Sequence, residues 1–151
     1  MAELSITSSP AAALNPEDVA WLTSRLAAYN AEKSGGMDLE LLHLFLRTPE
    51  GVLCGGLMGW TIWSWMHIDS LWVEAEYRGQ DHGKRLLQTA EEIAVNRGCT
   101  LVEVDTFSFQ ARGFYEKSGY KIFGTLSGIG GRFDRYYLSK TIGALDVTKI
   151  H

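Results

Sequence analysis

Cysteine is scarce in this sequence, and no long apolar run occurs in it. Its 151 residues include only two cysteines, Cys54 and Cys99, both in apolar, strand-like surroundings without a CxxC or Cys/His spacing. We therefore expect buried, reduced thiols, a pattern that suits the cytoplasm. No metal site is expected either, because the histidines are scattered and form no cluster with cysteine.

Three further absences exclude whole classes of function. No window reaches the roughly 18 apolar residues that a membrane span needs, and the N-terminal residues lack the basic and apolar regions of a secretory signal. The net charge of −4 and the lack of a basic stripe argue against nucleic-acid binding. The negative balance is compatible with a cationic substrate such as an amine.

What the sequence does contain is typical of one globular domain. Apolar residues make up 46% and charged residues 21% of the chain, and a chain of this length buries roughly two-thirds of its unfolded surface. We expect a single domain over residues 1–142 and a flexible tail over residues 143–151.

Turn and capping signals divide this domain into helices and strands. Asn15 and Pro16 predict a helix start, and residues 84–97 carry an apolar stripe of Leu86, Leu87, Ala90, Ile93 and Ala94. Residues 39–46 fit either a short helix or a strand. Further helices are expected over residues 16–32 and 110–118, and strands over 52–65, 66–73, 101–106, 120–126 and 132–139. This order predicts an α/β (α+β) fold, a sheet with helices on both faces.

The segment from residue 71 to 87 is the most informative part of the chain. An apolar strand runs into a glycine-bearing loop flanked by Arg78 and Lys84, and the loop opens into the best predicted helix. Backbone amides in such a loop, together with the helix dipole, favour a phosphate or pyrophosphate. An ordinary strand-to-helix turn is the alternative. A Rossmann site is rejected, because the first two glycines of its pattern are missing.

Two motifs at the right separation resemble the signatures of the GNAT superfamily of N-acetyltransferases. Arg78-Gly79-Gln80-Asp81-His82-Gly83 resembles the acyl-CoA signature, and the strand at 101–104 with residues 111–120 resembles the second signature. The resemblance implies a mixed, mostly antiparallel sheet flanked by helices and direct acetyl transfer from acetyl-CoA to a primary amine of a small molecule or peptide. A non-catalytic acyl-CoA sensor or interaction module with the same fold is the competing hypothesis.

The resemblance also implies which residues contact acetyl-CoA. They are Leu71, Trp72, Val73, Arg78, Gly79, Gln80, Asp81, His82, Gly83, Lys84, Ser108, Phe114 and Tyr115. Two of them depart from the family pattern. Asp81 replaces a glycine, and we expect its carboxylate to point away from the diphosphate or to cap the helix. Ser108 stands where the family has asparagine, and its hydroxyl can still bond the pantetheine chain.

Catalytic roles follow from the same resemblance. A tyrosine matching Tyr115 acts as the general acid in the family, while a core aromatic is the alternative here. Alternation along a strand would place His67, Asp69, Leu71 and Val73 on one face, and His67 or Asp69 is the candidate base. Either residue could instead bind the substrate ammonium, with water relaying its proton, or the two could form a buried polar pair.

Other conspicuous side chains allow two interpretations each. Glu103 matches a common family residue with a structural role, while Asp105 is a candidate for the substrate groove. Four tryptophans, at 60, 63, 65 and 72, fit core or interface packing or an aromatic wall for the acceptor. Arg132, Arg135 and the Tyr136-Tyr137 pair fit the rim of the acceptor groove or a homodimer contact.

Overall fold

The computed structural model describes residues 2–143 and divides the chain into two compact units, Met1–Met37 and Asp38–His151. The first unit contains a short 3₁₀ helix, η1 (Ala11–Ala13), and the helix α1 (Pro16–Ser34). The side chain of Asn15 accepts a hydrogen bond from the Glu17 amide and so caps α1 as predicted. Gly35, in the left-handed conformation, ends the helix.

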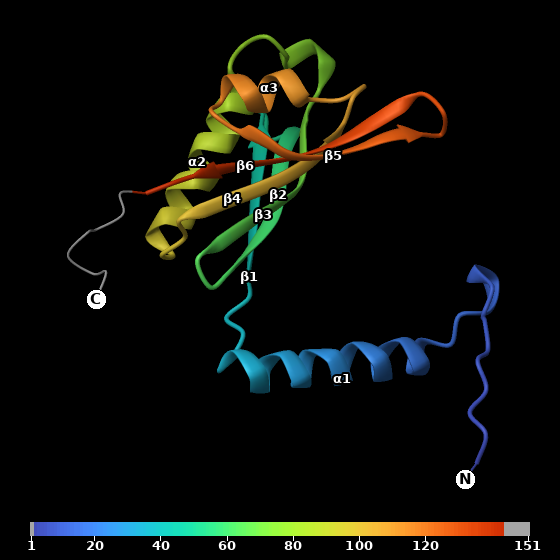
Figure 1. The fold of residues 1–151 in the computed structure, drawn as a ribbon. Coiled ribbons are helices and arrows are strands. Elements are labelled where there is room, and N and C mark those ends of the chain that lie inside the picture. Colours follow the sequence, from blue (N-terminus) through green and yellow to red (C-terminus); the bar gives the residue numbers. More distant parts are fainter. Residues whose placement is uncertain (1, 144–151) are drawn as a thin grey trace. The chain divides into compact units, whose positions relative to one another are not determined.

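The second unit is built around one six-stranded sheet with the order β1-β2-β3-β4-β6-β5 (Figure 1). Its strands are β1 (Glu40–Arg47), β2 (Leu53–Ile62), β3 (Trp65–Val73), β4 (Leu101–Phe107), β5 (Lys121–Ile129) and β6 (Phe133–Thr141). All neighbours are antiparallel except β3 and β4. The mixed, mostly antiparallel sheet is therefore confirmed, and the undecided segment at residues 39–46 is a strand.

The parallel pair β3 and β4 is in register only at one end. The ladder joins Trp65 to Leu101 and stops at Ile68 and Val104, although both strands continue beyond that point. A register shift against β2 follows immediately, since Met58 pairs with Ser70 and Gly59 with Ile68. Asp69 is therefore the extra residue of a β-bulge, and β3 changes its alternation there.

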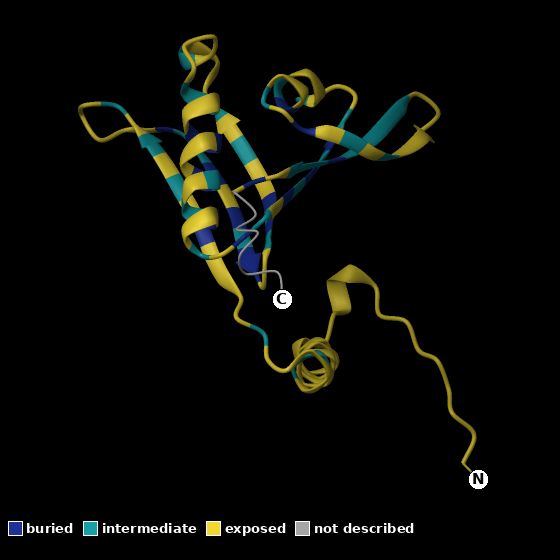
Figure 2. Cartoon of the chain, turned by 60° about the vertical axis from the view of Figure 1, so that its left-hand side comes forward, coloured by how far each residue is buried: buried dark blue, intermediate teal, exposed yellow. Residues whose placement is uncertain are grey.

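The helix α2 (His82–Asn96) packs across β1, β2 and β3 and covers one face of the sheet. We call this the inner face and the opposite one the outer face. Leu86, Leu87, Ala90 and Ala94 are the buried residues of this helix, and Ile93 packs at their edge. Figure 2 shows exposed and buried stretches along the same helix. This stripe was predicted from its helical spacing. Gly98 follows the helix with a positive φ, as expected for a C-terminal glycine.

Two short helices complete the second unit. A short 3₁₀ helix, η2 (Ala75–Tyr77), follows β3, and α3 (Arg112–Lys117) follows β4. Both cysteines are free and buried, as predicted. The single domain expected over residues 1–142 stays a prediction. The tail prediction falls, apart from Gly143, outside the described residues.

No helix in the described range, residues 2–143, has the length and apolar character needed to cross a bilayer.

Candidate active site

The loop before α2 has the backbone geometry of an anion site. Among the described residues, no acceptor receives a hydrogen bond from any backbone amide of residues 79–84, and the first bond of the helix runs from the Arg85 amide to the Asp81 carbonyl. Six consecutive amides are thus available in front of a 15-residue helix. Unpaired amides and the positive end of the helix dipole both favour a phosphate group.

Asp81 takes a backbone conformation that explains the family's glycine at this position. Its φ is 64° and its ψ is 10°, in the left-handed region where glycine is the usual residue. Aspartate tolerates this region better than most residues do. Although Asp81 occupies the N-cap position, its side chain makes no capping hydrogen bond. Of the two alternatives expected for this carboxylate, capping of α2 is excluded, and orientation away from the diphosphate stays a prediction.

Arg78 ties the loop to the end of β3. Its Nε donates to the carbonyl of Val73 at 2.8 Å, and its guanidinium stacks 4.5 Å from the centre of the Trp72 ring. The side-chain Nε2 of Gln80 also donates within the loop, to the carbonyl of Glu76 at 3.1 Å. These two side chains hold the loop backbone in place, while Lys84 remains exposed next to it.

Beyond the bulge, β3 offers main-chain groups along the edge where β4 has diverged. The Glu74 amide donates to Cys54 of β2, and successive amides of a strand point to alternate sides. The amides of Leu71 and Val73 therefore point toward β4, past the end of the ladder, while that of Trp72 points to β2. Of the predicted segment 71–73, two amides are thus directed at this edge.

Tyr115 lies on α3 with its ring in the core, 5.5 Å from the ring of Tyr120 and 5.2 Å from that of Phe114. Burial, and to a lesser degree the charge of Asp105, raises the pKa of Tyr115 to about 12. Among the described residues its hydroxyl has no hydrogen-bond partner, yet only Arg135 Nε is there a fully buried side-chain polar atom without one. The phenol is thus a protonated donor with access to solvent.

On the outer face, His67 lies between two carboxylates. Its Nδ1 is 2.5 Å from Glu103 Oε2 and its Nε2 is 3.1 Å from Asp69 Oδ1. The ring of Trp60 lies 5.0 Å from the imidazole. The hydrogen bond to Glu103 is the main cause of a raised pKa of His67, partial burial opposes it, and the nearby charges add to it.

A second charged pair continues this face across the sheet. Asp105 and Arg135 form an ion pair between β4 and β6, and the guanidinium lies over the Phe107 ring. Tyr137 is opposite Asp105 in the ladder and belongs to the same face, whereas Tyr136 is opposite Thr106, which is buried on the inner side. The predicted Tyr136-Tyr137 pair is thus divided between the two faces.

One sequence prediction about the site needs correction, and a second stays open. His67 and Asp69 do meet, but Leu71 and Val73 pack against the inner core, because the bulge at Asp69 reverses the alternation between them. Ser108 bonds through its hydroxyl to the Asp134 amide of β6. Its side chain is therefore engaged on the side of β4 away from β3, and its role toward pantetheine stays a prediction.

Glu103 is the functional candidate that the sequence reasoning undervalued. It is 36 residues from His67 in the chain, yet the two are partners in the β3–β4 ladder. The signal was present, because a strand, a helix and a further strand predict parallel neighbours. Parallel neighbours in register bring the same face of both strands together.

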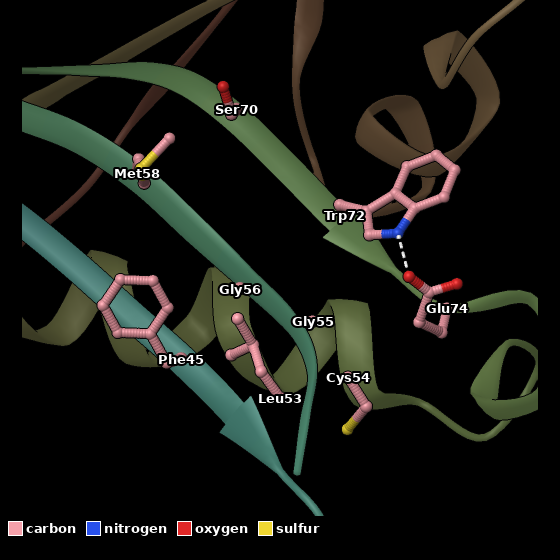
Figure 3. Close-up of a pocket in the computed structure, with 9 residues that line it drawn as sticks. All are labelled: Phe45, Leu53, Cys54, Gly55, Gly56, Met58, Ser70, Trp72 and Glu74. Carbon is pink, nitrogen blue, oxygen red and sulfur yellow. Dashed lines mark hydrogen bonds between the residues drawn. The ribbon is translucent and has the colours of Figure 1, made fainter.

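A shallow apolar groove occupies a separate part of the outer face, over β1, β2 and the end of β3 (Figure 3). Its volume is about 240 Å³, and its only charged side chain is Glu74, which accepts a hydrogen bond from the Trp72 indole at 3.3 Å. The groove contains neither His67 nor Tyr115. It offers apolar contact rather than proton transfer.

Comparison with known proteins identifies the class to which this fold and site belong. The Acetyltransferase (GNAT) family model matches residues 12–120. The chain is therefore a member of the GNAT acetyltransferase family, whose acetyl donor is acetyl-CoA.

Individual relatives agree with this assignment. The chain is 42% identical over 85 residues to blasticidin-S acetyltransferase of Streptomyces morookaense, a match over 56% of this chain and 62% of that protein, which is less than two-thirds of its length. It is 36% identical to an acetyltransferase of Agrobacterium fabrum, over 67% of this chain and 74% of that protein. A crystal structure of an acetyltransferase from Bacillus cereus superposes with a TM-score of 0.81 at 27% identity, over 92% and 98% of the two chains.

The residues of the site fit this acetyl donor. The six free amides at residues 79–84 suit its pyrophosphate. The free edge of β3 offers the amides of Leu71 and Val73 to an extended amide chain or a thioester carbonyl. Phe114 lies beside Gly83 at the start of α2.

Proposed function

We propose that this protein transfers the acetyl group of acetyl-CoA to a primary amine of a cationic small molecule. The observation that carries the proposal is the layout of β3, on which two groups of residues flank the bulge. Residues 71 and 73 offer amides on the free edge, and His67 and Asp69 offer titratable side chains. Acyl donor and amine acceptor can therefore approach the same stretch of strand.

The charge of the outer face supports a cationic acceptor. Asp69, Glu103 and Asp105 contribute three carboxylates, of which Asp69 is the most exposed, at 52% of its side chain. The indole rings of Trp60 and Trp65 lie 4.8 Å apart beside His67, and aromatic rings attract cations. The similarity to a blasticidin-S acetyltransferase is in keeping with an acceptor of this kind.

Proton transfers are assigned to two side chains. His67 takes the proton of the bound ammonium, with Asp69 holding the cation, because an imidazole is the better base near neutral pH. Tyr115 supplies a proton to the leaving thiolate, because its raised pKa keeps the phenol protonated. The Leu71 and Val73 amides stabilise the oxyanion that develops on the thioester carbonyl.

The test is a panel of amines offered with acetyl-CoA, with release of free thiol as the readout. The panel contains polyamines, aminoglycosides, nucleoside antibiotics with free amines, amino acids and lysine peptides. We expect turnover with cationic small molecules and little with neutral amines or peptides. If acetyl-CoA raises the melting temperature but no amine releases thiol, the non-catalytic acyl-CoA module is the better description.

Two finer expectations are part of this proposal. We propose a cytoplasmic location, in line with the free, buried thiols of Cys54 and Cys99. Fractionation of cells that express a tagged chain tests it. A homodimer is the second expectation, and its test is the molar mass in solution, by light scattering, with and without acetyl-CoA.

A further inference from the structure

The side chains of Glu103 and His67 make a short contact that strand pairing alone does not require. They are direct partners in the parallel ladder, their side chains share the outer face, and each is only 18% exposed. The carboxylate oxygen Oε2 lies 2.5 Å from the imidazole Nδ1. Such a bond to a partly buried carboxylate is charge-assisted and selects one orientation of the ring.

The other charged groups around His67 do not compete for Nδ1. From β3, Asp69 faces the opposite nitrogen, Nε2, at 3.1 Å. From β4, Asp105 acts only through its charge, and from β6, Arg135 is paired with Asp105. From β2, the neighbour is the uncharged ring of Trp60. Asp69 favours a proton on Nε2 and Glu103 favours one on Nδ1, but the Glu103 contact is shorter, at 2.5 Å against 3.1 Å, and less exposed, at 18% against 52%. Glu103 is therefore the stronger determinant of which nitrogen keeps its proton in the neutral ring.

We propose that Glu103 is a positioning residue, which binds the Nδ1–H of His67 so that Nε2 is the atom that accepts the proton of the substrate amine. The inference rests on the proposed function and assigns the tautomer that this function needs. Hydrogen positions follow here from the partners of each nitrogen.

The proton transfer balances with these groups alone. In the neutral ring, Nδ1–H remains bonded to Glu103, and the lone pair of Nε2 faces the ammonium. An N–H bond of the ammonium breaks, its electron pair stays on the amine as the nucleophile, and a new N–H bond forms at Nε2. The resulting imidazolium donates from Nε2 to Asp69, and both its protons then have carboxylate acceptors.

The test compares Glu103→Gln with Glu103→Ala in the full-length protein by nitrogen-15 NMR of the histidine rings. A glutamine oxygen can still accept Nδ1–H but carries no charge. We expect Glu103→Gln to keep the Nδ1-protonated tautomer with a lower pKa of His67. Glu103→Ala should lose this tautomer and lower kcat/KM by about 10- to 100-fold.

Asp105→Asn is the matched control, since it removes a carboxylate from the same face of β4 without removing the bond to Nδ1. It should leave the tautomer unchanged. The inference is overturned if both Glu103 variants keep the wild-type tautomer and pKa of His67. Because NMR needs no turnover, that result is distinguishable from failure of the amine panel, which contradicts the proposed function instead.

Discussion

Gly83 at the start of α2 faces the ring of Phe114 on α3. A β-carbon built on Gly83 would lie 3.5 Å from Cε2 and 3.6 Å from Cζ of that ring, at ordinary contact distance. One added methyl group therefore fits, but a longer side chain meets Phe114 or must turn into the space in front of the helix.

We predict that Gly83→Glu abolishes acetyl-CoA binding, while Gly83→Ala retains it. The glutamate adds bulk beside Phe114 and a negative charge in front of the free amides, where the diphosphate binds. Isothermal titration with acetyl-CoA checks both variants, and circular dichroism shows that each is folded. Equal affinity of the two variants for acetyl-CoA would show that the pyrophosphate does not bind at this loop.

Asp81 should weaken acetyl-CoA binding by its charge rather than by its backbone. We expect Asp81→Asn and Asp81→Gly to tighten binding by similar factors, corresponding to about 0.5–1 kcal/mol, because both remove a negative charge beside the diphosphate and both tolerate a positive φ. Titration at low and at high salt provides the measurement. Tighter binding in the glycine variant alone would implicate the backbone instead.

Tyr115→Phe should chiefly lower turnover. General acid catalysis is worth about 100- to 10,000-fold, and the variant keeps the ring that packs against Phe114 and Tyr120. With a pKa of about 12, the wild-type phenol stays protonated through neutral and moderately alkaline pH, so no alkaline limb from this group is expected below about pH 10. If kcat of Tyr115→Phe equals that of the wild type at every pH, Tyr115 is not the general acid.

The pH dependence of kcat/KM separates His67 from Asp69. The neutral form of His67 is the active one, and its pKa is raised above 6.5, so the wild-type activity should fall as the pH drops through that raised value. We expect His67→Ala to lose this acid limb together with most activity. Asp69→Ala should keep the limb and raise the KM of the amine. If the acid limb of kcat/KM persists in His67→Ala, His67 is not the base.

Lys140→Met tests an ion pair on the inner face that should affect stability but not acetyl transfer. Lys140 donates to Glu91 at 2.9 Å, and Tyr120 bonds the same carboxylate at 2.8 Å. Removal of the cation leaves a largely buried carboxylate, which costs about 1–3 kcal/mol of unfolding free energy. Urea denaturation should show this loss, and Lys140→Arg should show less. Acetyl-CoA affinity should be unchanged in both variants.

Local patterns predicted the elements whose signals lie within a few residues. The apolar stripe at 86–94 identified α2, and Asn15 with Pro16 identified the start of α1. The strand β1 stayed undecided, because eight apolar-rich residues fit a short helix equally well until a neighbouring strand pairs with them.

The site was harder to predict because it depends on register. The bulge at Asp69 appears only when β3 is aligned with β2, and it overturned the shared face of His67 and Leu71. The contact of His67 with Glu103 depends on the alignment of two strands separated by a helix. Neither alignment is encoded in the residues next to the site.

The bulge also makes β3 modular. Up to and including the bulge, at positions 67 and 69, the strand contributes side chains, whose chemistry point mutations change. Downstream, at 71 and 73, it contributes amides, which every residue except proline supplies. A lineage of such enzymes can thus change its acceptor by substitution on one half of a single strand, while on the other half any apolar residue that still fills the core at 71 and 73 keeps the amides for the common acyl donor.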